Sequence, residues 1–324
     1  MSALGMGEMA QAEDLADHFK TVVRGFREGI LTVILGAGAS LYGRSDQTDE
    51  KWSGAPSAQE LADRLAKEFD VPVKPDGTNL LKIAQWITSM KGGPSHLQRE
   101  LHRVFDRDLP MLPLHEFLAS VPGRLREKGL LHQPPLFLTT NYDDLLERAL
   151  DAKGEEYDVL VYMADNPFRG QFCLQEPGGK LQVLDPDSSA ANPAKRTVVV
   201  KLHGYVDRHV EEFHDSYVIT EDHYIEYLGR ADLDKLLPVH VLERLLDCNL
   251  LFLGYSLNDW NLRAILFQLR AKAVSNDWWS VQLGCDQVEA KSWAKRDVDM
   301  INIALEDYVP GLEAAFEEWL ASHG

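Results

Sequence analysis

The sequence predicts an α/β fold with a doubly wound, mostly parallel (Rossmann-like) sheet. Three observations predict it: short apolar runs that do not alternate with polar residues, small or polar residues directly after these runs, and helical patterns between them. Strands covered by helices on both faces have this uniformly apolar composition. Alternation of strands and helices along a chain is typical of such a sheet. We expect one domain over residues 1–324.

The predicted strands are apolar runs rich in Val, Ile, Leu or Phe. Gly, Asn, His or Ser follows each prominent run closely, so we expect each strand to end there. The four prominent runs are Leu31–Leu35, Leu136–Leu138, Thr197–Leu202 and Leu250–Leu253. Two further strands are predicted at Trp278–Leu283 and Val298–Leu305.

Helices are predicted between the strands by apolar residues at helical spacing. The clearest start is Ser57-Ala-Gln-Glu60, a capping box in which each of the two outer side chains accepts a hydrogen bond from the other residue's backbone N–H. Further helices are predicted at Asp143–Leu150, Asn258–Leu269 and Pro310–Ser322.

Two regions interrupt the alternation of strands and helices. Residues from about 41 to 131 contain several helical patterns and no convincing strand, so we expect a helical insertion that acts as a smaller subdomain. Residues from about 170 to 196 are rich in Pro, Gly, Ser and Asp, which is typical of an exposed loop or hairpin.

Composition restricts the function classes. The net charge of −18 argues against direct nucleic-acid binding, which depends on clustered Lys and Arg. The three cysteines, Cys173, Cys248 and Cys285, form no CxxC pair, so we expect no disulfide framework, no cysteine zinc site and no metal. The chain shows no secretory signal and no membrane-length apolar run. We therefore expect a cytoplasmic protein without membrane contact.

The first strand is followed by Gly36-Ala37-Gly38-Ala39-Ser40. Small residues let backbone N–H groups approach a diphosphate, and Ser40 adds a hydroxyl donor. The dehydrogenase fingerprint GxGxxG is absent, because Leu41 occupies the position of the third glycine. The alternative interpretation is a tight turn whose small residues only allow strand packing.

The second strand is followed by Thr139-Thr-Asn141-Tyr-Asp143-Asp144. Asn and Asp are favoured at helix N-caps, so capping alone is one interpretation. One acid is enough for that role, which leaves Asn141 available to orient a water molecule, a ribose or a carboxamide. Residues that follow parallel strands meet at one edge of the sheet, where ligands bind.

The third and fourth strands are followed by His203-Gly204 and by Gly254-Tyr-Ser256. His203 is the only one of the eleven histidines that directly follows a predicted strand. A base that acts at neutral pH would lie at such a position. The alternative is a structural role, which is the usual one for a lone histidine. Ser256 is suited to a ribose or phosphate contact, or to helix capping.

Together and in this order, these strand ends resemble the sirtuin superfamily. Its signatures GAGxS, TxNxD, HG and GxS match Gly36–Ser40, Thr139 with Asn141 and Asp143, His203-Gly204, and Gly254 with Ser256. Protein-deacylating sirtuins carry a four-cysteine zinc module after HG, whereas this chain has only Cys248 before Gly254. The chain therefore resembles the sirtuin-like domains of bacterial anti-phage systems, which hydrolyse NAD⁺.

This resemblance implies an NAD⁺ glycohydrolase that releases nicotinamide and ADP-ribose and is a toxic effector of anti-phage defence. It implies that Asn141 holds water or a ribose hydroxyl, that His203 acts as a base or ribose partner, and that Asp143 meets the carboxamide or the developing positive charge. NAD⁺ itself would be bound by Gly36, Ala37, Gly38, Ser40, Thr139, Gly254 and Ser256, with Arg44 as a phosphate partner.

Two other functions remain open. A deacylase or ADP-ribosyltransferase would use the same nicotinamide-releasing step, but the missing cysteine module counts against it. A non-catalytic module that senses NAD⁺ or ADP-ribose would not need both Asn141 and His203. As partners, the resemblance implies a homo-oligomer and a HerA-type ATPase, with an Argonaute-type protein as the second choice.

Overall fold

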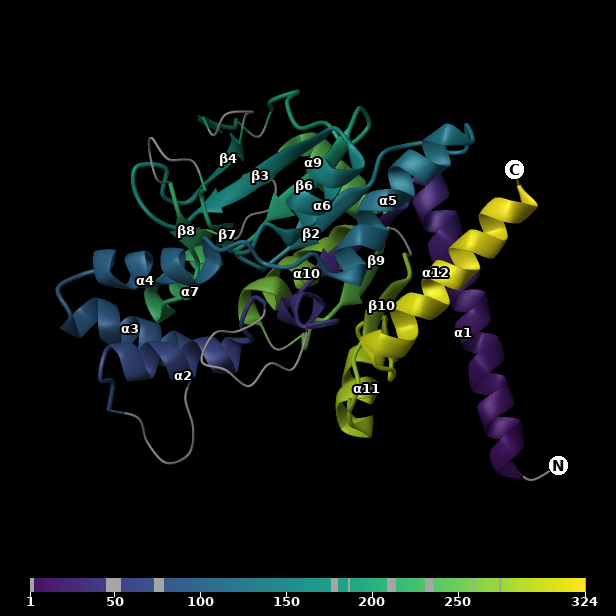
Figure 1. Cartoon of the computed structure of the whole chain (residues 1–324), viewed down its shortest axis with the longest axis horizontal. Coiled ribbons are helices and arrows are strands. Elements are labelled where there is room, and N and C mark those ends of the chain that lie inside the picture. The colour runs from purple at the N-terminus through teal and green to yellow at the C-terminus, as the bar shows by residue number, and fades with distance from the viewer. Residues whose placement is uncertain are drawn as a thin grey trace.

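The computed structural model describes residues 3–44, 54–72, 79–175, 180–185, 187–208, 214–230, 236–257, 259–273 and 276–323. Within them, nine strands form one sheet in the order β11-β10-β9-β1-β2-β6-β3-β4-β5 (Figure 1). The strands from β11 to β3 are parallel, and β4 and β5 add an antiparallel edge. The predicted α/β fold with a mostly parallel, Rossmann-like sheet is therefore confirmed.

The strands of this sheet are β1 (Leu31–Leu35), β2 (Leu136–Thr139), β3 (Tyr157–Met163), β4 (Gln171–Gln175), β5 (Leu181–Val183), β6 (Thr197–Lys201), β9 (Asn249–Leu253), β10 (Trp278–Val281) and β11 (Val298–Ile301). A separate two-stranded ladder pairs β7 (Gly204–Tyr205) with β8 (Ser216–Tyr217).

Helices cover both faces of the sheet, which explains the apolar composition of its central strands. On β1, Val33 and Leu35 pack into the core on one face, whereas Ile34 between them packs into the core on the other. The first face is covered by α1 (Ala3–Glu28), α5 (Pro113–Glu127), α6 (Leu145–Lys153) and α12 (Leu305–Ser322). The second is covered by α7 (Glu221–Arg230), α9 (Val239–Asp247) and α10 (Trp260–Lys272), and α11 (Gln287–Ala294) precedes β11.

The chain between β1 and β2 contains helices. A 3₁₀ turn, η1 (Ala37–Ser40), follows β1 directly, and α2 (Ala58–Glu68), α3 (Leu80–Met90) and α4 (Ser95–Phe105) share a third core with the β8 segment. These three helices lie together at one end of the molecule, opposite the crossing of α1 and α12 (Figure 1). The fourth long helix, α5, packs on the sheet instead. Residues 45–53 and 73–78 of the predicted insertion lie outside the described residues.

The capping box at the start of α2 is confirmed. The Ser57 side chain accepts from the Glu60 N–H, and the Glu60 carboxylate accepts from the Ser57 N–H. The two helices that follow strands start slightly later than predicted. Asp144 occupies the N-cap position of α6 without a side-chain capping bond, whereas the Asp259 side chain caps α10. The predicted start of the latter at Asn258 lies outside the described residues.

Several elements differ from the sequence predictions. β3 and α1 had no predicted counterpart, and the strand predicted at Val298–Leu305 is too long. β11 ends at Ile301, and Leu305 is already the first residue of α12, where its side chain packs against the core that α1 and α5 cover. The region from about 170 to 196 contains β4 and β5, and Cys173 of β4 is fully buried.

Candidate active site

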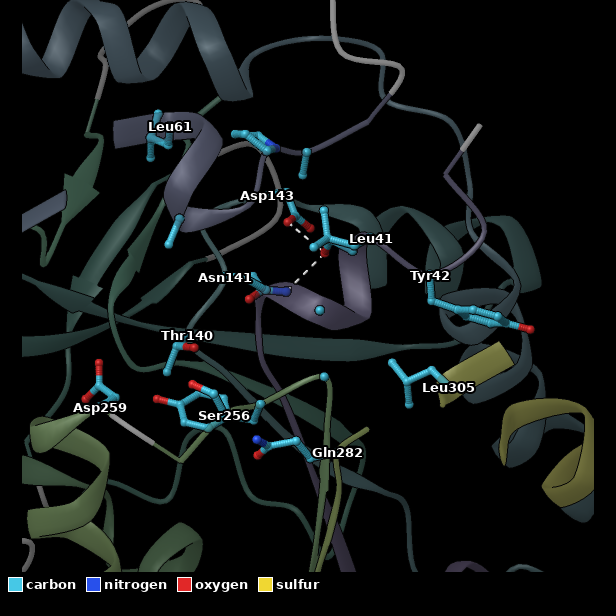
Figure 2. Close-up of a pocket in the computed structure, with 18 of the residues that line it drawn as sticks. Leu41, Tyr42, Leu61, Thr140, Asn141, Asp143, Ser256, Asp259, Gln282 and Leu305 are labelled. Atoms are coloured by element: carbon cyan, nitrogen blue, oxygen red, sulfur yellow. Dashed lines mark hydrogen bonds between the residues drawn. The ribbon is translucent and has the colours of Figure 1, made fainter. Parts of the chain in front are cut away.

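The four predicted strand ends meet at one edge of the sheet, because β9, β1, β2 and β6 are neighbours in it. A cavity of about 770 Å³ lies at this edge. Its polar lining includes Ser40, Asn141, Asp143, His203, Ser256 and Asp259. Figure 2 labels four of these residues, Asn141, Asp143, Ser256 and Asp259. Apolar residues of the α2 and α3 region, including Leu61 and Leu80, form another wall. The cavity therefore brings together candidate catalytic and binding residues from four strand ends.

Asn141 is the centre of a buried hydrogen-bond network. Its Nδ2 donates to the carbonyl oxygen of Gly36 at 3.0 Å. It also donates to Ser40 Oγ at 3.0 Å, and Ser40 Oγ donates to Asp143 Oδ2 at 3.0 Å (dashed lines in Figure 2). Both N–H groups of the Asn141 amide are thus committed to the protein. The side chain is left with Oδ1, an acceptor, to offer to a water molecule or a hydroxyl group.

Hydrogen bonds also fix the position of the Asp143 carboxylate. Its Oδ2 accepts from Ser40, and its Oδ1 accepts from the backbone N–H of Leu145 at 3.3 Å, at the start of α6. A carboxylate at a helix N-terminus is favoured by the orphan N–H groups there. Asp143 therefore supplies a positioned acceptor and a negative charge at the cavity wall.

His203 follows β6 and is buried at the cavity wall. Its burial lowers the pKa of the imidazole below the ordinary value of 6.5, and the nearby Asp259 carboxylate opposes that shift. The ring meets Tyr224 and Tyr227 edge-on at centroid distances of 5.7 and 6.1 Å. At neutral pH the imidazole is therefore neutral, which is the form that accepts a proton or a hydrogen bond.

Asp259 is a polar residue of the cavity that the sequence reasoning did not select. Its Oδ2 accepts from the Tyr224 hydroxyl at 2.6 Å and lies 3.9 Å from His203 Nε2, and its Oδ1 accepts from the Leu262 N–H at 2.9 Å. The signal was available, because Asp259 follows a predicted strand in the same way as Asp143.

The glycines of the strand ends bring two loops into contact. A Cβ atom on Gly38 would lie 2.8 Å from Gly254 Cα, and one on Gly254, whose φ is +65°, would lie 2.0 Å from the Ala39 nitrogen. The N–H groups of Gly36 and Gly38 donate to the carbonyl oxygens of Leu253 and Gly254. Loop packing thus requires these glycines, while Ala37, Gly38, Ser40, Gly254 and Ser256 line the cavity.

Three predicted binding residues, Gly36, Thr139 and Arg44, are not among the cavity-lining residues. The Thr139 hydroxyl donates to the Leu35 carbonyl oxygen and accepts from the Asn141 N–H, so Thr139 shapes the loop that carries Asn141. Arg44 forms a two-point ion pair with Glu60 at 2.7 and 2.9 Å, which lowers the pKa of that carboxyl to about 2. The structure places Arg44 at the start of α2, because this carboxylate of the capping box attracts it.

A buried ion pair lies behind the Asn141 loop. Lys201, at the end of β6, is fully buried, and its Nζ donates to Glu147 Oε1 at 2.7 Å and to the Asp143 carbonyl oxygen at 2.5 Å. Burial raises the pKa of Glu147, and Lys201 counteracts this. The pair ties β6 to the loop and to α6.

Two further properties concern the described residues only. No group of three or more His, Cys, Asp or Glu side chains in that part of the chain is arranged to hold a metal ion. Among the helices of the same residues, none combines the length and the apolar character needed to cross a bilayer.

Curated proteins related to this chain include NAD⁺ hydrolases. NAD(+) hydrolase ThsA of Cytobacillus dafuensis is 24% identical over 263 residues, which are 81% of this chain and 42% of that protein. ThsA of Enterococcus faecium is 28% identical over 256 residues, 78% of this chain and 43% of that protein. Defense-associated sirtuin 2 of Bacillus subtilis is 22% identical over 261 residues, 79% of this chain and 21% of that protein. The chain thus spans less than half the length of these relatives.

Among solved structures, cytosolic 5'-nucleotidase IIIB bound to cytidine aligns over 95% of this chain and 91% of that chain, with 12% identity and a TM-score of only 0.37. The model of the SIR2-like domain family, in contrast, matches residues 135–301. This match runs from the start of β2 to the end of β11 and includes more than half of the chain. The chain therefore belongs to the SIR2-like domain family.

Proposed function

We propose that this chain is an NAD⁺ glycohydrolase, which cleaves the bond between nicotinamide and ribose. The observation that carries the proposal is that Asn141 and His203, from two different strand ends, line one cavity. A volume of about 770 Å³ lies within the range of about 300 to 1,000 Å³ that is usual for ligand sites. The ThsA relatives are named as NAD⁺ hydrolases, which supports the same reaction.

The proposed reaction passes through an oxocarbenium-like transition state, in which positive charge develops on the ribose. Asn141 Oδ1 accepts a hydrogen bond from the attacking water or from a ribose hydroxyl. Neutral His203 serves as a base or as a hydrogen-bond partner of the ribose. The Asp143 carboxylate, fixed by Ser40 and Leu145, offsets the developing positive charge or contacts the carboxamide.

The diphosphate of NAD⁺ would be bound without a basic side chain. Among the described residues that line the cavity, none is Lys or Arg. The Ser40 hydroxyl already donates to Asp143, and the N–H groups of Gly36 and Gly38 donate to loop carbonyl oxygens. In a chain with a net charge of −18, the proposed donors are therefore other backbone N–H groups of the strand ends and the Ser256 hydroxyl. The apolar wall from the α2 and α3 region would limit the access of competing water.

Measurement of nicotinamide release from NAD⁺ tests this function. We expect Asn141→Ala to reduce kcat by about 10³-fold or more, because the acceptor that orients a reactant is lost. Asn192→Ala is the matched control, because the Asn192 side chain only accepts a loop N–H, from Ala194, outside the cavity. Full activity of Asn141→Ala, with an unchanged melting temperature, would contradict the proposal.

We further propose that the protein acts in the cytoplasm as an effector of anti-phage defence, as a homo-oligomer or with a HerA-type ATPase. An Argonaute-type partner is the second choice. The name of the Bacillus subtilis relative and the greater length of all three relatives support a role within a larger system. Light scattering of the purified chain, alone and with each candidate, tests the assembly. A chain that stays monomeric and fully active alone would contradict it.

A further inference from the structure

Asp259 and His203 face each other across a gap at the cavity wall. Asp259 Oδ2 lies 3.9 Å from His203 Nε2, which is too far for a direct hydrogen bond. Both side chains line the cavity, and both are largely buried, with exposed fractions of 15% and 6%. This separation lets one hydroxyl oxygen lie within hydrogen-bond distance of both atoms, about 2.7 to 2.8 Å from Oδ2 and about 2.9 to 3.0 Å from Nε2.

Contacts on both sides keep this gap open. The Tyr224 hydroxyl and the Leu262 N–H hold the two oxygens of Asp259, so the carboxylate cannot approach His203 without losing a bond. The His203 ring is confined by the edges of Tyr224 and Tyr227. The distance between Asp259 Oδ2 and His203 Nε2 is therefore fixed by the contacts that each side chain makes with its neighbours.

We propose that Asp259 and His203 bind one hydroxyl group of the nicotinamide ribose between them. This inference rests on the proposed function. The hydroxyl donates its proton to Asp259 Oδ2 and accepts from the Nε2–H of neutral His203, so both partners are satisfied and no proton is transferred. A hydroxyl that donates to a carboxylate gains electron density on its oxygen, which stabilises positive charge developing on the ribose. Asp259 is thereby a catalytic residue that touches the substrate.

Asp259→Asn separates this role from the structural one. Asn is as good an N-cap as Asp, and its side-chain oxygen can accept from the Leu262 N–H or from Tyr224. The substitution removes the charge that a bound hydroxyl would meet. It also replaces one carboxylate oxygen with an NH₂ group, which can donate to the Tyr224 hydroxyl oxygen while the remaining oxygen accepts from Leu262. Asp286→Asn is the matched control, because Asp286 caps α11 through the Glu289 N–H at 2.7 Å and lies outside the cavity.

The experiment is a cycle of variants and substrates. The proteins are the wild type, Asp259→Asn and Asp286→Asn. The substrates are NAD⁺ and two analogues, one lacking the 2′-hydroxyl and the other the 3′-hydroxyl of the nicotinamide ribose. For each combination, kinetics give kcat/KM for nicotinamide release, and calorimetry gives Kd. We expect Asp259→Asn to reduce kcat/KM for NAD⁺ by about 10- to 100-fold, as for loss of a hydrogen bond to a charged group. With one of the two analogues, the same substitution should cost less than about threefold, because the contact is already missing.

Each outcome decides between the interpretations. If Asp259→Asn costs the same factor with NAD⁺ and with both analogues, Asp259 does not contact a ribose hydroxyl and the inference is overturned. Equal losses in Asp286→Asn would also overturn it, because a general effect of the substitution would then explain the result. If the wild type releases no nicotinamide, the proposed function fails, and the same cycle in Kd still tests the hydroxyl contact.

Discussion

Lys201 Nζ lies 2.7 Å from Glu147 Oε1, and this buried ion pair also holds the backbone carbonyl of Asp143. The pair connects the strand that precedes His203 with the loop that carries Asn141. Lys201 and Glu147, which do not line the cavity, thus help to fix the position of Asn141 relative to His203.

Lys201→Met should lower the free energy of unfolding by about 3–5 kcal/mol, because it leaves the Glu147 carboxylate buried without its partner. The double variant Lys201→Met with Glu147→Leu should recover much of this loss. Urea unfolding measures both. Nicotinamide release should stay low in the double variant, because the Asp143 carbonyl still lacks its donor. Additive stability losses in the double variant would disprove coupling between the two residues.

Ser40→Ala should impair catalysis more than stability. The Ser40 hydroxyl accepts from Asn141 and donates to Asp143, so its removal takes away one of the two side-chain hydrogen bonds that fix each of them. We expect about a 10- to 100-fold loss of kcat and about 1 kcal/mol of stability, the usual contribution of a hydrogen bond. Steady-state kinetics and thermal unfolding measure the two effects. A raised KM with unchanged kcat would instead indicate that Ser40 only binds substrate.

The activity should depend on the protonation of His203. Burial keeps the pKa of His203 below 6.5, and an imidazolium beside the ribose would oppose the positive charge that develops there. Therefore kcat/KM should be constant at neutral pH and fall only in more acidic solution. Because the Asp259 carboxylate raises this pKa, Asp259→Asn should move the acidic midpoint to a still lower pH. The pH profile of nicotinamide release in both proteins measures the shift. A midpoint that moves upward in the variant would contradict this electrostatic assignment.

Stability should fall in mild acid because of His115 on α5. This side chain is 1% exposed, and its burial lowers the pKa to about 4, whereas it is 6.5 in the unfolded chain. The unfolded state therefore binds the extra proton between pH 6.5 and 4, and stability is lost as the pH falls through this window, by up to about 3 kcal/mol. His115→Leu should flatten this part of a urea-unfolding series, and exposed His132→Leu should not.

Much of the sheet was predictable because its central strands are buried on both faces. A run such as Leu31–Leu35 is apolar at every position for that reason, and its place in the sheet is visible without any knowledge of its neighbours. β3 escaped notice because it begins with two half-buried residues, Tyr157 and Asp158, and pairs on one side with the antiparallel edge strand β4.

The amino-acid sequence by itself determined the central strands, their ends and the resemblance of these ends to sirtuins, because each is a local pattern of apolar and small residues. It also placed Asn141 and His203 correctly at the edge of the sheet. Only the tertiary structure decided that Arg44 pairs with Glu60, that Lys201 supports the loop, and that Asp259 faces His203. These are contacts between elements, and a side chain's choice among several oppositely charged partners depends on the distances that folding creates.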